Sequence, residues 1–360
     1  MKIGIFKSSY DVHGGAEVLT YYLSKALNSK VYTFITAEKN EFGFIDISKD
    51  LPLIAKILRR KREFDYLSWS CIDVRDYGDF DIVVSIGETA RALITPDDIV
   101  HVHYLLTPMR RLYDVWHHNR KMKSFFKREI LLPLLSEFYR VWGKAIDCRV
   151  DYYLSISPVV QRRLWKYLKR ESKVIYPPIE FKKYKFKESD DFYLFIGRLE
   201  DLKRPEEAIL GCIKANRRIV VIGTGSLEKY LREKYSKHPL VEIKGFVSEE
   251  EKIDLLSRCK AVIYPCLAED FGIVPIEAFA SGKPVIADNT GFPPYVVNED
   301  RGIVTDCSKP ENIAKAIEFL ERKEYNPDKI REFAKQFDFE NFKKKLREQL
   351  KIWYEKWIML

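Results

Sequence analysis

Apolar and polar positions near the start of the chain predict a strand, a loop and a helix, in that order. Residues 2–6 form a short apolar run, and a loop with Gly14 and Gly15 follows it. Over residues 17–27 the apolar positions recur at the three- and four-residue spacing of an amphipathic helix. A strand followed closely by a helix is the first step of an alternating α/β fold.

The same order starts again in the middle of the chain. Residues 192–196 are an apolar run, Gly197 begins a loop, and Pro205 begins a helix. Proline suits the first helical position because an N–H there has no partner within the helix. Further apolar runs, each predicted to be a strand, occupy residues 82–86, 99–104, 152–155, 218–222, 241–244, 261–264, 284–287 and 302–304. Short apolar strands that alternate with helices predict parallel sheets covered on both faces. We therefore expect two doubly wound α/β domains with a ligand-binding cleft between them, because such sheets bind ligands beyond the carboxyl ends of their strands.

The predicted domain boundary lies at residues 176–179, where consecutive prolines exclude a helix. At the end of the chain, residues 340–360 are predicted to be a helix with a single apolar stripe. The stripe consists of Leu346, Leu350, Trp353, Trp357 and Leu360. We expect this stripe to pack on protein, and insertion into a membrane is the alternative.

The composition is that of an ordinary folded protein of about two domains. Of the 360 residues, 46% are hydrophobic and 32% are charged, which excludes disorder over most of the chain. The sequence has no long uncharged apolar run, so it predicts neither a membrane-spanning helix nor a signal peptide. The six cysteines form no C-x-x-C pair and no zinc spacing. We interpret them as reduced thiols of a cytoplasmic protein without a bound metal.

Positive charge is concentrated in one part of the chain. The formal net charge is +9, and residues 110–170 hold fifteen Lys or Arg against five acidic residues. A smaller basic cluster occupies residues 59–62. A basic face indicates an anionic partner, and a solvated helix face is the alternative. The basic stretch also carries the aromatic residues Trp116, Phe125, Phe126, Trp142 and Trp165. We expect the amino-terminal domain to rest on an anionic membrane surface.

One stretch, residues 264–287, is the most informative about chemistry. A strand is expected to end at Tyr264 and a short helix to begin near Pro275, with a glycine-containing loop between them. The backbone N–H groups of Gly272, Ile273 and Val274 then lie at the start of that helix, where a diphosphate binds favourably. The stretch therefore predicts a phosphate-binding loop in the second domain.

Two carboxylates flank this loop. Glu277, in the first helical turn, is suited to accept two hydrogen bonds from a ribose diol, and stabilisation of the helix dipole is the alternative. Glu269 precedes the glycine and is placed to reach a different part of the same ligand, such as the hydroxyls of a sugar.

The spacing of Glu269, Phe271, Gly272 and Glu277 resembles the E-x7-E signature of retaining glycosyltransferases of family 4, which have the GT-B fold. Further segments similar to motifs of that family are Gly197-Arg198-Leu199 with Lys203, Gly223-Thr224-Gly225, Gly245-Phe246-Val247 and Gly14-Gly15-Ala16-Glu17. Two more segments look most like the mannosyltransferases of the family, namely Thr107-Pro108-Met109-Arg110 and Tyr176-Pro177-Pro178. The resemblance covers nearly the whole chain.

This resemblance implies two Rossmann-like domains that face each other across a cleft. Residues 1–176 would bind the acceptor, and residues 177–339 would bind the nucleotide sugar. Residues 340–360 would return as a helix to the first domain.

The resemblance also implies roles for individual residues. Arg198 and Lys203 would neutralise the negative charge that develops on the leaving diphosphate, without a metal or any cofactor. Glu269 would hold the transferred sugar, and Glu277 would hold the ribose. The other residues expected at the donor are Gly14, Gly15, Gly223, Gly245, Phe246, Val247, Phe271, Gly272, Ile273 and Val274.

Two histidines are candidates in the first domain. His101 and His103 lie on one predicted strand and share one face. We expect His103 to act in catalysis through a hydrogen bond to the sugar or the acceptor, and His101 to contact the donor one layer deeper. Satisfied, buried histidines are the alternative. Leu106 stands where related mannosyltransferases carry a histidine, so the residue that meets the acceptor stays open.

Together these observations predict a retaining, metal-independent glycosyltransferase that moves a hexose to a glycan or lipid-linked acceptor. By resemblance the donor is GDP-mannose, and the enzyme is cytoplasmic and peripheral on the inner face of the membrane. An epimerase or phosphorylase of the same fold is the first alternative. A nucleic-acid-binding protein is the alternative from another class, and the acids of the loop around Glu269 argue against it, so no nucleic-acid partner is expected. An NAD-dependent oxidoreductase is weaker still, because Glu228 replaces the third glycine of a G-x-G-x-x-G that begins at Gly223.

Overall fold

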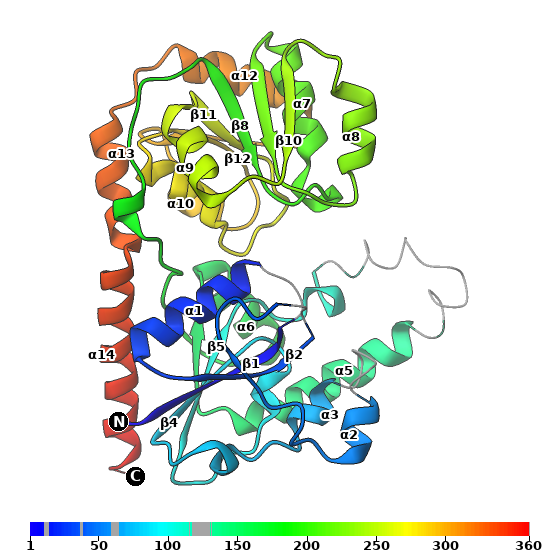
Figure 1. Ribbon diagram of the computed structural model, residues 1–360, viewed down its shortest axis with the longest axis vertical. Coiled ribbons are helices and arrows are strands. Elements are labelled where there is room, and N and C mark those ends of the chain that lie inside the picture. The colour runs from blue at the N-terminus through cyan, green and yellow to red at the C-terminus, as the bar shows by residue number, and fades with distance from the viewer. Residues whose placement is uncertain are drawn as a thin grey trace. The chain divides into compact units, whose positions relative to one another are not determined.

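The structure is a computed structural model that describes residues 1–10, 14–36, 39–58, 65–114, 116, 130 and 132–359. The chain divides into two compact units (Figure 1). The amino-terminal unit comprises Met1–Tyr176 and Phe342–Leu360, and the carboxy-terminal unit comprises Pro177–Asn341. Each unit contains one parallel β-sheet.

The amino-terminal unit has a seven-stranded sheet in the order β3-β2-β1-β4-β5-β6-β7. Its strands are β1 (Ile3–Tyr10), β2 (Val31–Ile35), β3 (Ile45–Asp46), β4 (Ile82–Ile86), β5 (Val100–Leu105), β6 (Tyr152–Ser155) and β7 (Lys173–Val174). Strands β4 and β5 are buried at every position, which explains why apolar residues occur on both of their faces. The order of strands reverses between β1 and β4, which pair directly.

Helices cover this sheet (Figure 1). They are α1 (Gly15–Leu27), α2 (Leu53–Leu58), α3 (Asp65–Trp69), α5 (Leu132–Ile146) and α6 (Pro158–Leu168), with 3₁₀ turns at Val74–Tyr77, Ala90–Ala92, Arg110–Leu112 and Asp147–Arg149. Helix α6 begins after Ser157, whose hydroxyl accepts the backbone N–H of Val160, and Pro158 fits its first turn.

The carboxy-terminal unit has a six-stranded sheet in the order β10-β9-β8-β11-β12-β13. Its strands are β8 (Phe192–Ile196), β9 (Arg218–Ile222), β10 (Val241–Gly245), β11 (Ala261–Tyr264), β12 (Val285–Asp288) and β13 (Gly302–Thr305). Its helices are α7 (Pro205–Lys214), α8 (Glu228–Tyr235), α9 (Glu249–Arg258), α10 (Ile273–Ala280), α11 (Pro293–Val296), α12 (Pro310–Glu321) and α13 (Pro327–Ala334), with 3₁₀ turns at Phe181–Lys183, Asp201–Lys203 and Lys335–Phe337. Here the order of strands reverses between β8 and β11, which are neighbours.

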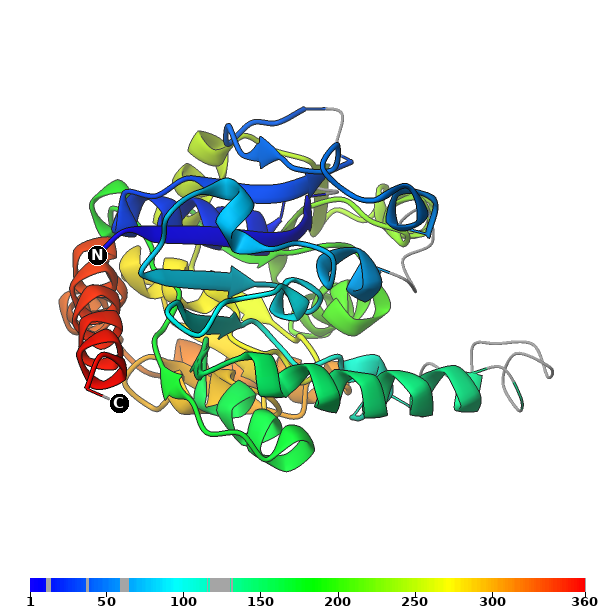
Figure 2. The same cartoon turned by 90° about the horizontal axis from the view of Figure 1, so that it is seen from below.

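The last helix, α14 (Phe339–Trp357), packs on the amino-terminal unit and is drawn in red in Figures 1 and 2. Leu346 and Leu350 are fully buried. The Trp353 ring stacks on Tyr152 at 4.7 Å, and the Trp357 indole N–H donates a hydrogen bond to the Asp97 carbonyl. The stripe therefore packs on protein, as predicted from its spacing, and its last member, Leu360, lies outside the described residues.

The predicted fold class, two doubly wound parallel-sheet domains, is confirmed. One difference is the length of β1, which continues to Tyr10 although the pattern indicated an end at residue 6. The strand passes Lys7 because the Lys7 ammonium is buried and paired with Glu17. Strands β2, β3 and β7 were not predicted. Two residues are too few to show a pattern for β3 and β7. The apolar run of β2 was a usable signal that the sequence analysis missed. Over the described part of the chain, no helix combines the length and the apolar character needed to cross a bilayer.

Candidate active site

The candidate site lies at the carboxyl ends of β8 and β11, where the order of strands in the carboxy-terminal unit reverses. Open parallel sheets bind ligands at such a point. The loop after β8 carries Gly197, Arg198 and Lys203, and the loop after β11 carries Glu269 and Gly272. The fold therefore brings together residues that the sequence places about seventy positions apart.

Lys203 and Glu269 form an ion pair across these two loops. Their side chains are 21% and 19% exposed, so both remain accessible to solvent. Burial alone would lower the pKa of Lys203, but the charge of Glu269 outweighs this effect and holds that pKa above its ordinary value. The site thus keeps an ammonium group in its charged form next to a carboxylate.

The backbone around Glu269 is held by the loop that follows β12. Ala268 donates its N–H to the Thr290 hydroxyl (2.8 Å), and Phe292 donates its N–H to the Glu269 carbonyl (2.9 Å). Gly291 has a φ of +75°, and a Cβ there would lie 2.4 Å from the Glu269 nitrogen. Because only glycine allows this approach, the loop after β12 determines where Glu269 lies.

Asp288, the last residue of β12, supports both site loops. Its carboxylate accepts hydrogen bonds from Arg204 (2.7 Å), from the Thr290 hydroxyl and from the Cys307 N–H (3.2 Å). Arg204 follows Lys203 directly, so this buried ion pair ties the Lys203 loop to the Glu269 loop. Neither Asp288 nor Arg204 was predicted as a site residue, and the available signal was an acidic residue at the end of a buried strand.

Helix α10 begins at Ile273 with Gly272 as its N-cap. Gly272 has a φ of +74°, and a Cβ there would lie 2.8 Å from the Tyr264 hydroxyl, so a side chain is excluded. None of the described side chains caps this first turn, and Gly272, Ile273 and Val274 are partly exposed. Backbone N–H groups at such a helix start can bind an anion.

Glu277 is buried in the second turn of α10, not in the first as predicted, because the helix begins at Ile273 rather than near Pro275. Its carboxylate already has partners. Its Oε1 accepts hydrogen bonds from the Tyr184 hydroxyl (2.8 Å) and the Lys252 ammonium (2.7 Å). Burial opposes the charge of Lys252, but Glu277 and Glu249 outweigh it and raise the pKa of that lysine. The sequence analysis missed Tyr184 and Lys252, because nothing in their spacing links them to Glu277.

The glycines of two predicted motifs have a packing reason in the fold. Gly223 donates its N–H to the Gly245 carbonyl (2.8 Å). It has a φ of +125°, and a Cβ there would lie 1.9 Å from the Gly197 carbonyl oxygen. The loops after β8, β9 and β10 therefore touch through their backbones, and this contact requires glycine at position 223 whether or not a donor binds there.

Other predicted donor residues differ in exposure. The Arg198 side chain is 72% exposed and pairs with Glu200 at 3.0 Å, and Phe246 is 84% exposed at the end of β10 next to the partly exposed Val247. Phe271, in contrast, is buried and stacks on a neighbouring ring. Arg198 and Phe246 are therefore available to a ligand, whereas Phe271 packs in the interior.

In the amino-terminal unit, Gly14 and Gly15 lie at the start of α1, close to the carboxyl end of β1. The Gly14 carbonyl accepts the N–H groups of Glu17 and Val18. The Glu17 carboxylate pairs with the Lys7 ammonium at 2.9 Å, and both side chains are at most 10% exposed. Neither Lys7 nor Glu17 was predicted as a site residue, although a lysine inside an apolar strand was a usable signal.

His101 and His103 share one face of β5, as predicted, and both are fully buried. Ser85 on β4 lies between them, with its hydroxyl 2.7 Å from His101 Nε2 and 2.8 Å from His103 Nδ1. His101 Nδ1 also contacts the Arg149 carbonyl at 2.8 Å. Burial lowers the pKa of His101 to about 4 and lowers the pKa of His103 well below its usual range. Both side chains are therefore buried, but His103 Nε2 has no hydrogen-bond partner among the described residues, so the roles expected for the two histidines stay predictions.

Much of the basic stretch at residues 110–170 is occupied by contacts within the protein where it is described. Arg110 and Arg163 pair with Asp114, and Arg140 and Arg149 donate to backbone carbonyls. Among the aromatic residues of the stretch, Trp165 is 53% exposed and Trp142 packs against the core. Phe125, Phe126 and the basic cluster at residues 59–62 lie outside the described residues.

Comparison with known proteins identifies one family over the second half of the chain. Residues 178–337 match the sequence model of the glycosyl transferases group 1. The matched residues span nearly all of the carboxy-terminal unit, which is called the group 1 unit below. Glu269 and Glu277 and the Lys203 loop all lie within the matched range of this group 1 unit.

Relatives with known names extend the similarity. The chain is 27% identical over 209 residues to an uncharacterised glycosyltransferase of Methanocaldococcus jannaschii, covering 56% of this chain and 59% of the relative. It is 29% identical over 202 residues to the α-1,3/1,6-mannosyltransferase ALG2 of Saccharomyces cerevisiae, covering 41% of this chain and 40% of the relative. The chain thus matches at most about 60% of the length of these curated relatives.

Solved structures are similar over nearly the whole chain. The structure of Anabaena HepE in complex with UDP superposes with a TM-score of 0.69 at 17% identity, covering 98% of this chain and all of that one. Sucrose-phosphate synthase of Thermosynechococcus elongatus gives a TM-score of 0.70 at 17% identity, covering 99% and 100%. At this identity the likeness establishes the fold, and it includes the amino-terminal unit as well as the group 1 unit.

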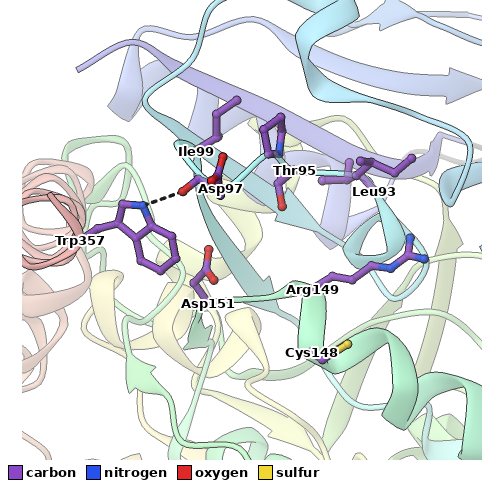
Figure 3. Close-up of a pocket in the computed structure, with 10 residues that line it drawn as sticks. Leu93, Thr95, Asp97, Ile99, Cys148, Arg149, Asp151 and Trp357 are labelled. Atoms are coloured by element: carbon purple, nitrogen blue, oxygen red, sulfur yellow. Dashed lines mark hydrogen bonds between the residues drawn. The ribbon is translucent and has the colours of Figure 1, made fainter. Parts of the chain in front are cut away.

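A cavity of about 390 Å³ lies in the amino-terminal unit and not in the group 1 unit (Figure 3). Its lining includes Ile99, Asp151 and Trp357. Ile99 and Asp151 directly precede β5 and β6, so the cavity opens at the amino ends of these strands. Because parallel sheets bind ligands at the opposite edge, we do not assign the donor to this cavity.

Over the described residues no group of three or more His, Cys, Asp or Glu side chains is arranged to hold a metal ion. The cationic groups near the group 1 loops are instead Lys203, Arg198 and Arg204.

Proposed function

We propose that the chain is a retaining glycosyltransferase that transfers a hexose from a nucleotide sugar without a metal. The observation that carries the proposal is the Lys203–Glu269 ion pair at the switch point of the group 1 unit. It sets a charged ammonium, a carboxylate and an uncapped helix start at one sheet edge. A nucleotide sugar needs a cation for its diphosphate and an acceptor group for its sugar hydroxyls, which these residues supply.

The roles follow from the charge of each group. When the bond between sugar and diphosphate breaks, negative charge grows on the departing phosphate oxygen. Lys203 and the exposed Arg198 neutralise that charge, together with the N–H groups of Gly272, Ile273 and Val274. Glu269 binds the hydroxyls of the transferred sugar.

Glu277 binds the ribose of the donor. Lys252 and Tyr184 hold its carboxylate in place, and both bond to Oε1. A carboxylate has lone pairs on both oxygens, so Oε2 has capacity to accept a ribose hydroxyl. At the end of β10, Gly245, Phe246 and Val247 meet the base.

Retention of configuration follows if the acceptor oxygen attacks from the face that the diphosphate leaves. In this mechanism the departing phosphate oxygen takes the proton of the acceptor hydroxyl as the new C–O bond forms. No covalent sugar–enzyme intermediate is needed. An NMR assignment of the product anomer tests this step, and an inverted product would refute it.

For the donor sugar we propose mannose from GDP-mannose. The names of two relatives support this choice, namely the yeast mannosyltransferase and a GDP-mannose-dependent mannosyltransferase of Mycobacterium tuberculosis. UDP-glucose is the competing donor, because a similar solved structure is a complex of Anabaena HepE with UDP and glucose. The acceptor is a glycan or a lipid-linked glycan.

We place the enzyme in the cytoplasm, peripheral to an anionic membrane. All six cysteines are free thiols, as expected for a reducing compartment. The net charge of +9 favours an anionic surface.

Calorimetric titration of the full chain with GDP, UDP and GDP-mannose, with and without EDTA, tests the proposal. We expect one base to bind at least about tenfold more tightly than the other, with EDTA leaving the affinity unchanged. The variant Lys203→Ala, which removes the proposed cation at the diphosphate, should bind the donor more weakly. Lys229→Ala, at a lysine whose side chain is 89% exposed, is its control and should bind as the wild type does. If the folded chain binds none of these ligands, the proposed donor site is wrong.

A further inference from the structure

A continuous row of hydrogen bonds crosses two strands of the amino-terminal unit. The Ser85 hydroxyl on β4 lies 2.7 Å from His101 Nε2 and 2.8 Å from His103 Nδ1, both on β5. At the far end, His101 Nδ1 lies 2.8 Å from the Arg149 carbonyl oxygen. The two histidines and the serine are fully buried, so solvent does not share these contacts. We call this row, from Arg149 through His101 and Ser85 to His103, the His–Ser–His chain.

The proton of His101 lies on Nδ1, because the Arg149 carbonyl oxygen can only accept a hydrogen bond. Burial lowers the pKa of His101 to about 4, so at about pH 7 the ring is neutral and carries no second proton. Its Nε2 is then an acceptor. Ser85 has one proton to donate and must donate it to His101 Nε2.

The same reasoning places the proton of His103. Because the Ser85 proton points to His101, the Ser85 oxygen can only accept from His103, so His103 Nδ1 carries the proton. Burial and the charge of Arg91 lower the pKa of His103 well below its usual range, which keeps this ring neutral as well. His103 Nε2 therefore carries a lone pair and accepts hydrogen bonds.

This lone pair on His103 Nε2 has no hydrogen-bond partner among the described residues. The Arg91 guanidinium is instead bonded to Glu88 and Asp147. A buried acceptor without a partner costs free energy, which marks a position where a donor group binds. Ionised phosphates and carboxylates only accept, so they do not suit it. Since the ring is enclosed, the group that reaches it is as small as a hydroxyl.

We propose that Ser85 and His101 are positioning residues that hold His103 Nε2 as the hydrogen-bond acceptor for a substrate hydroxyl. The proposal rests on the proposed function, because the hydroxyl belongs to the transferred sugar or to the acceptor of that reaction. It adds the direction of the bond, in which the hydroxyl donates and the histidine accepts. The same direction excludes the diphosphate as a partner of His103.

NMR of the full chain with isotope-labelled histidine nitrogens tests the proton positions directly. Two-bond proton–nitrogen correlations separate a protonated ring nitrogen from one with a lone pair, and the variants His101→Gln and His103→Gln assign the signals. At about pH 8, above the ordinary pKa of histidine, we expect both rings to carry the proton on Nδ1. His238 is an internal reference of the opposite kind, because its Nδ1 accepts the Leu240 N–H.

The variant Ser85→Ala tests the positioning role. Without the hydroxyl, the His103 proton should be shared between Nδ1 and Nε2, and turnover of GDP-mannose should fall about tenfold with the loss of one hydrogen bond. Ser85→Thr keeps a hydroxyl and should restore both. Ser155→Ala is the matched control, because Ser155 is equally buried on β6 but bonds to Ser172 and not to a histidine. It should leave the proton positions and turnover as in the wild type.

Addition of nucleotides distinguishes the two sources of the hydroxyl. If the hydroxyl belongs to the transferred sugar, GDP-mannose shifts the His103 Nε2 signal and GDP alone does not. If turnover falls in Ser85→Ala although GDP-mannose leaves that signal in place, the hydroxyl belongs to the acceptor. In both cases Ser85→Ala should bind GDP in calorimetry as tightly as the wild type does.

Three results would overturn the proposal. The first is a wild-type His103 with its proton on Nε2. The second is a Ser85→Ala variant that matches Ser155→Ala in both proton position and turnover. The third is a shift of the His103 Nε2 signal by GDP alone, which would place the diphosphate there. A folded chain with the expected proton positions that binds none of GDP, UDP and GDP-mannose would instead refute the proposed donor and leave the positioning of His103 standing.

Discussion

The two sheets share one architecture but place their titratable groups differently. In the carboxy-terminal unit, Lys203 and Glu269 lie on loops beyond the strand ends and are about one fifth exposed. In the amino-terminal unit, His101 and His103 lie within β5 and are fully buried. The first pair can exchange its partner for a ligand, whereas the second pair is enclosed by Ser85 and neighbouring strands.

This difference teaches where chemistry can be located in a doubly wound fold. A polar side chain in a strand that is buried on both faces lies in the interior, however reactive that side chain is. A loop after the same strand places the side chain at an edge that a ligand reaches. Residue type is therefore a weaker guide to a site than position relative to the strand end.

The largest effect that sharpens this comparison is expected for Lys203→Met. Removing the ammonium should lower turnover about 10²–10³-fold, because charge on the leaving diphosphate loses its main partner. Lys229→Met, at an 89% exposed lysine, should leave turnover unchanged. Turnover is measured as nucleotide released from the donor. A loss of less than about threefold would show that Lys203 only positions Glu269.

A smaller effect is expected for Glu277→Gln. This change removes one of the two carboxylates that pair with the Lys252 ammonium, and Glu249 remains as the other. Breaking a buried ion pair costs about 3 kcal/mol in the free energy of unfolding. The double variant Glu277→Gln/Lys252→Met should recover more than half of that loss without recovering donor affinity. Urea unfolding measures the first quantity and calorimetry the second. Full donor affinity in the double variant would remove Glu277 from the ribose site.

The third prediction concerns the buried histidines and pH. Because burial lowers the pKa of His101 to about 4, the unfolded chain takes up a proton near pH 6.5 that the folded chain does not bind. The stability held by the neutral histidine is therefore present above pH 6.5 and is lost as the pH falls toward 4. At pH 5 the loss is about 2 kcal/mol for His101.

The variant His101→Gln isolates this effect. The Asp151 carboxylate accepts a hydrogen bond from the backbone N–H of His101, and burial raises the pKa of Asp151. Its contribution to the pH dependence of stability therefore has the opposite sign to that of His101. The pH dependence of the wild type is the sum of both contributions. The difference in pH dependence between wild type and variant gives the contribution of the histidine. Urea midpoints at pH 7 and pH 5 should differ less in the variant. Equal pH dependence would mean that His101 is protonated in the folded protein at pH 5.

The smallest effect on stability is expected for Arg198→Gln. Its side chain is exposed and its pair with Glu200 is a surface ion pair. The free energy of unfolding should therefore change by less than about 0.5 kcal/mol. If Arg198 contacts the diphosphate, turnover falls about tenfold all the same. Thermal unfolding and turnover are both measured for the variant and compared with the wild type. Unchanged turnover would leave Lys203 as the cation that acts at the diphosphate.

The fold and part of the site could be predicted because they depend on local spacing. Apolar runs of four to six residues identified the central strands, and prolines and glycines identified where helices begin and end. The strand that was predicted too short shows the limit of this method. Lys7 looked like the end of a strand, because its partner Glu17 cannot be inferred from hydrophobic pattern alone.

By itself the sequence determined two doubly wound sheets, some of their helices and the motif positions of Lys203, Glu269 and Glu277, since each depends on residues close together in the chain. Only the tertiary structure decided which side chains meet. Glu269 meets Lys203 66 positions away, and Glu277 meets Tyr184 93 positions away. The order of strands sets these distances in space, and that order depends on packing of the whole sheet rather than on any local pattern. For the same reason only the fold showed that His101 and His103 are buried within the sheet.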